Sequence, residues 1–248
     1  EVAYTVCLSS NYIFIRILFL SYYHNFPFQD SFNSMKISFM QAPTVSSQLK
    51  PQLMNGEINF KKIHNLANDG FDQMPLEERT LGWLVMLHIY PLNPSNWDQC
   101  FGEIVHNYWS NIENYKLKDW HQNKVSQINI ERSDIDDSHQ MSLIHIDIIR
   151  MNRYLQYFEN QNNLDEYILR IERILYVFAK TISDIGYVQG MNEIVFVFFY
   201  LYELTKSVMK NNSDYVEAFV YQSLVNLITT TQLKSVYHIN NNAESIIK

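Results

Sequence analysis

Apolar residues recur at helical spacing along much of the chain, and polar stretches separate the segments that carry them. Between residues 164 and 178 the apolar positions fall three or four residues apart, which is the spacing of one face of an α-helix. Residues 76–91 and 97–108 show the same period, and residues 215–228 form a further amphipathic stretch. The pattern therefore predicts an all-α protein.

Local signals place the ends of these helices. Pro75 occupies a typical first-turn position, and Pro91 would stop the helix after about four turns. Asn96 can cap the next helix, which would begin at Trp97. Residues 183–186, which end in a glycine, break the helix that covers residues 164–178.

Two segments need other criteria than periodicity. Residues 194–204 are apolar almost all round, so the pattern does not separate a buried strand from a buried helix, and length favours a helix. Residues 124–140 are polar and acidic, which predicts a loop. Its aspartates lack the glycine and the final glutamate of a calcium-binding loop, so we expect a solvated loop without a metal.

The organised part of the chain is expected over residues 57–248. Residues 1–56 read as an amino-terminal extension and linker, poorly ordered, because residues 40–56 are polar and without a period. The apolar run over residues 12–23 carries Arg16 and falls short of the roughly 18 residues that indicate a membrane span. We therefore expect no transmembrane span.

Composition narrows the class of partner. The formal net charge of −7 argues against nucleic acid, because binding to phosphates requires lysine and arginine in excess. The two cysteines form neither a C-x-x-C pair nor a disulfide framework, which favours a reducing, cytoplasmic compartment. The histidines show no metal-ligand spacing, and no phosphate-binding loop is present.

Two short strings carry the candidate chemistry. Residues 144–150 contain Ile144, Asp147 and Arg150 at a spacing of three, which by itself fits a helix face with a weak ion pair. Residues 187–193 place Gln189 beside a glycine at a junction between a loop and a helix, where functional residues often lie. Either string alone has a structural explanation.

Together and in this order, the two strings resemble the fingerprints of the TBC domain, the Rab GTPase-activating module: I-x-x-D-x-x-R followed by Y-x-Q. The similarity extends from about residue 57 to the end of the chain and includes an R-x-x-x-W signature at Arg79 and Trp83. The resemblance implies an all-α, Rab-GAP-like helical domain. Because Gln189 lies close to the last residue, it also implies that the carboxy-terminal subdomain is cut short.

The resemblance assigns roles to single residues. Arg150 matches the arginine finger, and Gln189 matches the glutamine finger that orients the attacking water. An arginine given in trans stabilises charge on the transferred phosphoryl group, and its planar fork of donors is not copied by lysine. Supporting positions follow at Asp147, Tyr187, Gly190 and Asn192.

The implied partner is a Rab-family small GTPase in its GTP state, which holds GTP and Mg²⁺ itself. The chain would then be an activator rather than an enzyme, with no cofactor of its own. It would act in vesicle trafficking, in the cytoplasm at the periphery of endomembranes, and meet a membrane only through the GTPase. The alternative is a catalytically weak TBC-like module that binds a GTPase or another protein as a scaffold. It is favoured by residues 151–154, which lack the proline usual after the arginine. A third reading is a helical scaffold unrelated to GTPases.

Overall fold

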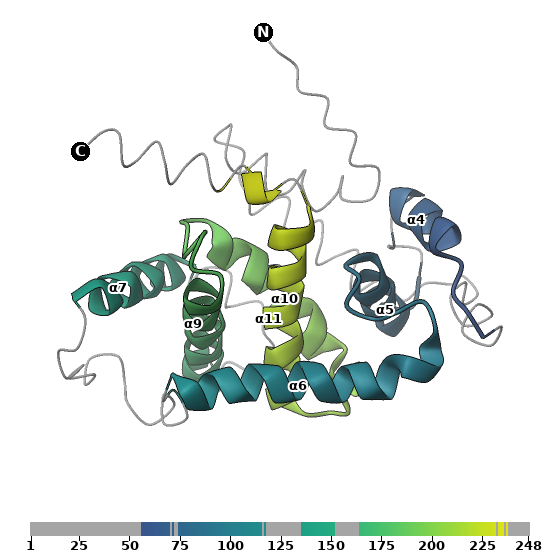
Figure 1. Cartoon of the computed structure of the whole chain (residues 1–248), viewed down its shortest axis with the longest axis horizontal. Coiled ribbons are helices and arrows are strands. Elements are labelled where there is room, and N and C mark those ends of the chain that lie inside the picture. The colour runs from purple at the N-terminus through teal and green to yellow at the C-terminus, as the bar shows by residue number, and fades with distance from the viewer. Residues whose placement is uncertain are drawn as a thin grey trace, which may run out of the picture. The chain divides into compact units, whose positions relative to one another are not determined.

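The computed structural model describes residues 56–69, 71, 74–115, 117, 135–151, 164–231, 233–235 and 237. All regular elements within these ranges are helices, which confirms the all-α prediction (Figure 1). The contacts divide the chain into two units, residues 1–100 and 101–248. The expected amino-terminal extension and linker, except residue 56, and the apolar run over residues 12–23 lie outside the described residues.

The first unit contains α4 (Phe60–Asp69), α5 (Leu76–Met86), the 3-10 helix η2 (Pro94–Asn96) and the beginning of α6 (Trp97–Asn114). Helix α4 packs against α5. Arg79, the arginine of the R-x-x-x-W signature, is buried, and its Nε donates to the carbonyl oxygen of Met74 at 2.8 Å. The ring of Trp83 meets Phe71 edge to face. Both residues of this signature therefore stabilise the start of α5.

One of the predicted helix ends in this unit is confirmed, because α6 begins at Trp97, and one is wrong. Helix α5 ends at Met86 rather than Pro91, because the chain turns back at His88, whose φ of 55° is left-handed. The carbonyl oxygen of Leu84 then accepts from the backbone N–H groups that follow His88. Asn96, the predicted cap of α6, is the last residue of η2, which leads directly into α6. The capping side chain is that of Asn93, which accepts from the backbone N–H of Ser95 at the start of η2.

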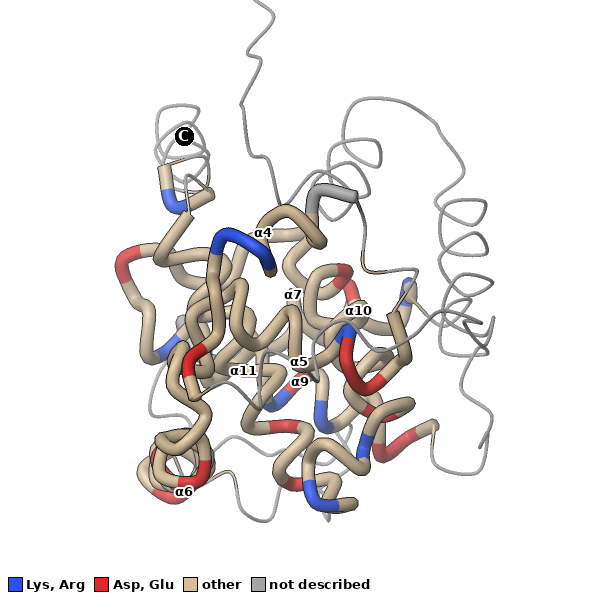
Figure 2. The backbone as a smooth tube through the Cα atoms, turned by 90° about the vertical axis from the view of Figure 1, so that its right-hand side faces the viewer, with Lys and Arg blue, Asp and Glu red and all other residues tan. Residues whose placement is uncertain are grey.

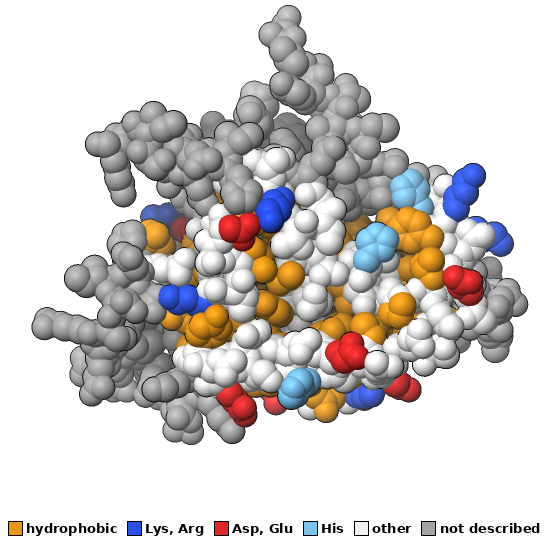
Figure 3. All heavy atoms as spheres, in the orientation of Figure 1, with side chains coloured by type: hydrophobic (Ala, Val, Ile, Leu, Met, Phe, Trp, Pro, Cys, Tyr) orange, Lys and Arg blue, Asp and Glu red, His pale blue; other side chains and the backbone are white. Residues whose placement is uncertain are grey.

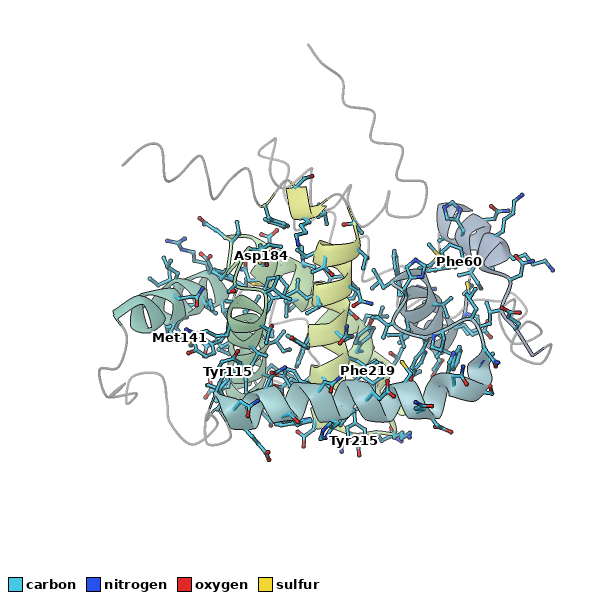
Figure 4. All side chains as sticks on the ribbon, in the orientation of Figure 1. Phe60, Tyr115, Met141, Asp184, Tyr215 and Phe219 are labelled. Carbon is cyan, nitrogen blue, oxygen red and sulfur yellow. The ribbon has the colours of Figure 1, made fainter. Side chains whose placement is uncertain are left out.

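The second unit is built around three helices that pack against one another: α9 (Leu164–Thr181), α10 (Met191–Leu204) and α11 (Ser213–Thr230). Helix α7 (Ile135–Arg150) packs on α9 and, at fewer points, on α10, while the 3-10 helix η6 (Lys206–Met209) connects α10 to α11. In Figure 1 the part of α6 that belongs to this unit runs across one end of α9 and α11. Tyr215 and Phe219 of α11, labelled in Figure 4, contact the ring of Phe101 in α6.

The structure shows that the apolar segment over residues 194–204 belongs to a helix, α10. Eleven of the 14 residues of α10 are buried, because neighbouring helices cover it on several sides, and this explains its apolar character all round. The predicted loop over residues 124–140 is wrong at its end, because α7 begins at Ile135. Aspartates 136 and 137 are as typical of a first helical turn as of a loop. Residues 124–134 lie outside the described residues.

A cluster of charged and aromatic side chains is buried where α6, α9 and α11 meet. Arg173 donates from Nε and Nη2 to the two carboxylate oxygens of Glu217, each at 2.5 Å. The hydroxyl of Tyr108 donates to the same carboxylate at 2.5 Å, and the Arg173 guanidinium stacks over the ring of Trp109. Arg173 is 1% exposed and Glu217 is fully buried. These residues, the Arg173–Glu217 cluster, tie three helices together in the core of the second unit.

Charge is mixed along the helices. Acidic and basic residues are interspersed along the tube in Figure 2. Within the part of the chain that the structure describes, each helix is too short or too polar to cross a bilayer.

Candidate functional site

The I-x-x-D-x-x-R string lies in the last two turns of α7, and its three fixed residues have different environments. Ile144 is fully buried in the core, and Asp147 is 8% exposed. The Arg150 side chain is 67% exposed, at the last residue of the helix. The helix thus presents the arginine to solvent while it holds the aspartate against its neighbours.

A buried carboxylate fixes α7 on α9. Nδ1 of His145 lies 2.5 Å from Oε1 of Glu172, which is fully buried in α9. The sequence indicates no metal ligand at His145, and the structure gives it this contact instead. Since His145 precedes Asp147 by two residues, the contact also sets where the aspartate lies.

The Y-x-Q string lies at the end of the connection between α9 and α10, which covers residues 182–190. Gly190 is the N-cap residue of α10 and has a φ of 97°, a left-handed conformation that strains any residue with a Cβ. No atom lies within 4 Å of a Cβ built at this position, so the backbone, not space, requires glycine. The backbone N–H of Met191 closes the turn on the carbonyl oxygen of Val188 at 3.1 Å. Gln189, in the middle of this turn, is exposed.

Asp147 connects the two strings. The hydroxyl of Tyr187 donates to Oδ2 of Asp147 at 2.8 Å, and Nη1 of Arg150 lies 3.4 Å from Oδ1. The side chain of Asn192, at the start of α10, donates to the backbone carbonyl oxygen of Asp147 at 3.3 Å. One residue of α7 therefore holds the turn on one side and the arginine on the other.

Tyr187 keeps its proton in this position. Burial raises the pKa of Tyr187, and the hydrogen bond to the Asp147 carboxylate raises it further, because ionised tyrosine could not donate that bond. At neutral pH the phenol is accordingly a donor, and the Asp147 carboxylate is oriented by it.

The structure brings the predicted site residues together through Asp147. Arg150, Asp147, Tyr187 and Asn192 form one set of contacts, and Gln189 and Gly190 lie in the turn between Tyr187 and Asn192. Neither proposed finger is sealed in the interior, since both Arg150 and Gln189 are exposed. In the part of the chain that is described, three or more His, Cys, Asp or Glu side chains do not gather into a metal site.

Sequence reasoning gave no role to two features of this region. The bond from Asn192 to a main-chain carbonyl leaves no trace in a sequence pattern. The outer face of α7 is also apolar, although helices on the surface usually turn polar residues outward. Figure 3 shows hydrophobic side chains at the surface at several places on the visible face. The sequence does contain a sign of this apolar outer face, because α7 has more apolar residues than a single buried face accommodates.

The arrangement suits the recognition of an anion held by another molecule. An exposed guanidinium offers several N–H donors, and an exposed carboxamide both donates and accepts hydrogen bonds without changing charge. Arg150 ends a helix that His145 attaches to α9, and Gln189 lies in a turn that Tyr187 attaches to Asp147, which limits the conformational freedom lost on binding.

Comparison with known proteins agrees with the motifs. A model of the Rab-GTPase-TBC domain family matches residues 77–246, well over half of the chain. No curated protein and no solved structure matches the chain. The matched residues include both strings, the Asp147 contacts and the R-x-x-x-W signature. The chain belongs to the Rab-GTPase-TBC domain family, whose members are GTPase activators, and this implies a small GTPase as partner.

Proposed function

We propose that the chain binds a Rab-type small GTPase in its GTP state and accelerates GTP hydrolysis by donating Arg150 and Gln189. The observation that carries the proposal is the position of Asp147, whose carboxylate contacts both the exposed Arg150 and the Tyr187 that begins the Gln189 turn. Two exposed groups from separate segments are thereby held near one buried anchor. A shared anchor of this kind supports the proposal that both groups address one phosphate.

Arg150 supplies positive charge to the transition state. During phosphoryl transfer, negative charge spreads over the phosphoryl and bridging oxygens, and a guanidinium can address two of these oxygens at once. An arginine given in trans contributes about 10³ to 10⁵ in rate, equivalent to roughly 4 to 7 kcal/mol. Arg150 is paired with Asp147 by one long contact of 3.4 Å, so it gives up little when it turns to a phosphate.

Gln189 orients the attacking water. Its carboxamide can accept a hydrogen bond from the water and donate one to a phosphate oxygen, which places the nucleophile without a change of charge. The left-handed Gly190 allows the turn that lifts Gln189 clear of the helix. Tyr187 and Asn192 act as positioning residues, because they attach both ends of this turn to Asp147.

Stimulated hydrolysis in a panel of Rab GTPases tests the proposal. We expect the wild-type domain to raise the GTP hydrolysis rate of at least one member, and Arg150→Ala and Gln189→Ala to abolish most of that increase. Leu204→Gln, an exposed position at the far end of α10, provides a matched surface control and should keep full activity.

Full stimulation by either finger variant would remove that residue from the proposed mechanism. Binding of a GTP-loaded Rab by the wild-type domain without faster hydrolysis would instead select the scaffold alternative. The sequence observation behind that alternative is the absence of the family's usual proline in residues 151–154.

A further inference from the structure

The outer face of α7 is an unusual surface. Among the residues that the structure describes, four large hydrophobic side chains are exposed, and three of them lie on α7: Leu143 (46%), Ile146 (46%) and Ile149 (51%). Single exposed hydrophobic residues are ordinary, but a contiguous group indicates an interaction surface. We name these three residues the α7 outer strip.

The strip leads to Arg150. With 3.6 residues per turn, positions 143, 146 and 150 fall in one row along the helix, and position 149 lies beside that row. The opposite face is formed by residues that are at most 5% exposed and contact the core: Met141, Ile144 and Ile148. The side chains of the strip therefore do not pack against the described core, and the strip ends at the proposed arginine finger.

We propose that the α7 outer strip is the docking surface for the GTP-loaded small GTPase, next to the phosphates that Arg150 reaches. The inference rests on the proposed function of Arg150. A rise of 1.5 Å per residue puts Leu143 about 10 Å along the axis from Arg150. A typical interface covers roughly 800 Å² on each partner, a patch about 30 Å across. A patch of that size centred on Arg150 extends about 15 Å in each direction and therefore covers the strip as well.

The chemistry of the strip fits the neighbourhood of a phosphate-directed arginine. Apolar side chains exclude water when they are covered, and a guanidinium interacts more strongly with a phosphate where water is excluded. Between Ser142 and Ile149 the exposed positions of α7 carry no charge, so the docked surface of the partner must be largely apolar too. In small GTPases the segments beside the terminal phosphate are ordered in the GTP state and released after hydrolysis. Docking to those segments would make binding depend on the nucleotide.

The test compares a double variant, Leu143→Gln with Ile146→Gln, with the control Leu204→Gln. Glutamine keeps helix propensity and approximate size while it removes the apolar surface. Leu204 is the fourth exposed large hydrophobic residue among those described. It is the last residue of α10, and the end of α10 that contacts α7 is the opposite one, at Asn192. We would measure stimulated hydrolysis against Rab concentration, and the Kd for Rab proteins loaded with a non-hydrolysable GTP analogue.

We expect the double variant to raise both KM and Kd about tenfold or more, as the loss of two buried aliphatic contacts implies. Its kcat at saturating Rab should stay within about threefold of wild type, since the fingers are intact. Leu204→Gln should leave all three quantities unchanged. Arg150→Ala should show the opposite split, with a large loss of kcat and a much smaller change of Kd.

Several results would contradict the assignment of the α7 outer strip as the docking surface. One is an unchanged Kd in the double variant, and another is a wild-type domain that binds no member of the panel. A lower unfolding midpoint in the double variant would mean that the chain itself covers these side chains. A dimer that the double variant dissolves without weakening Rab binding would assign the strip to a second copy. If wild type binds Rab without stimulating hydrolysis, the proposed function fails while the Kd comparison still decides the strip.

Discussion

Arg173 and Arg150 both pair with a carboxylate in the second unit, but the two pairs differ in burial and in the number and length of their contacts. Arg173 is almost fully buried and forms two hydrogen bonds of 2.5 Å with Glu217, with an aromatic ring stacked on its guanidinium. Arg150 is 67% exposed and makes one contact of 3.4 Å with Asp147. The first arginine has its Nε and Nη2 donors engaged by a buried carboxylate, and the second leaves most of its donors exposed to solvent. Exposure and geometry separate an arginine that the core uses from the one that we propose as the finger.

The comparison predicts opposite outcomes for the two arginines, and the larger effect is on activity. Arg150→Ala should lower GTPase stimulation by about 10³-fold or more, because charge on the phosphoryl oxygens loses its partner. The free energy of unfolding should change by less than about 0.5 kcal/mol, because an exposed, single ion pair contributes little. Hydrolysis assays and urea unfolding of the same preparation check both halves. A large loss of stability would show that Arg150 is structural after all.

Breaking the buried pair should have the reverse effect. Glu217→Ala leaves Arg173 as an uncompensated buried charge and removes the acceptor of Tyr108, so we expect a loss of about 3 to 5 kcal/mol in the free energy of unfolding. Urea or thermal unfolding measures it. Glu217→Gln, which keeps shape and one acceptor, should lose less. Equal stability of Glu217→Ala and wild type would contradict the role assigned to the cluster.

Removing the Tyr187–Asp147 contact tests whether Asp147 positions the proposed site without contributing to docking. Tyr187→Phe deletes the hydrogen bond to Asp147 without changing the shape of the ring. A hydrogen bond to a charged group contributes roughly 1.5 to 3 kcal/mol, so we expect kcat to fall about ten- to hundredfold. Kd for GTP-loaded Rab should change little, because Tyr187 does not need to touch the partner. Steady-state kinetics with a separate binding measurement distinguish this from a loss of docking.

The smallest expected effect is a dependence on alkaline pH. Burial and the negative charge of Glu217 raise the pKa of Tyr108 well above that of an unfolded tyrosine, near 10. A group whose folded pKa is raised contributes stability below the unfolded pKa and loses it as pH rises toward the folded pKa. At pH 11 Tyr108 should thus cost about 1.4 kcal/mol of stability relative to pH 9. Tyr108→Phe should show a correspondingly weaker decline above pH 10. An equal decline in both proteins would mean that Tyr108 ionises freely in the fold.

Some parts of the fold followed directly from the sequence. The helix over residues 164–178 was predicted from its period alone, and α9 contains it entirely. The end of α5 and the start of α7 were misplaced, because a left-handed non-glycine residue at His88 and an acidic first helical turn resemble other patterns in sequence. For the candidate site, the two motifs identified the residues, but the contacts of Tyr187 and Asn192 with Asp147 were visible only in the structure.

The sequence by itself determined the helical class, the family and the two motifs from which the fingers are proposed, because periodicity and short motifs are local properties of the chain. Only the tertiary structure decided that Asp147 is the shared anchor of both strings and that Arg173 is buried while Arg150 is exposed. It also showed that an apolar strip on α7 faces outward. The physical reason is that burial and pairing depend on which helices meet in space, and residues 147, 187 and 192 become neighbours only when α7 packs against α9 and α10.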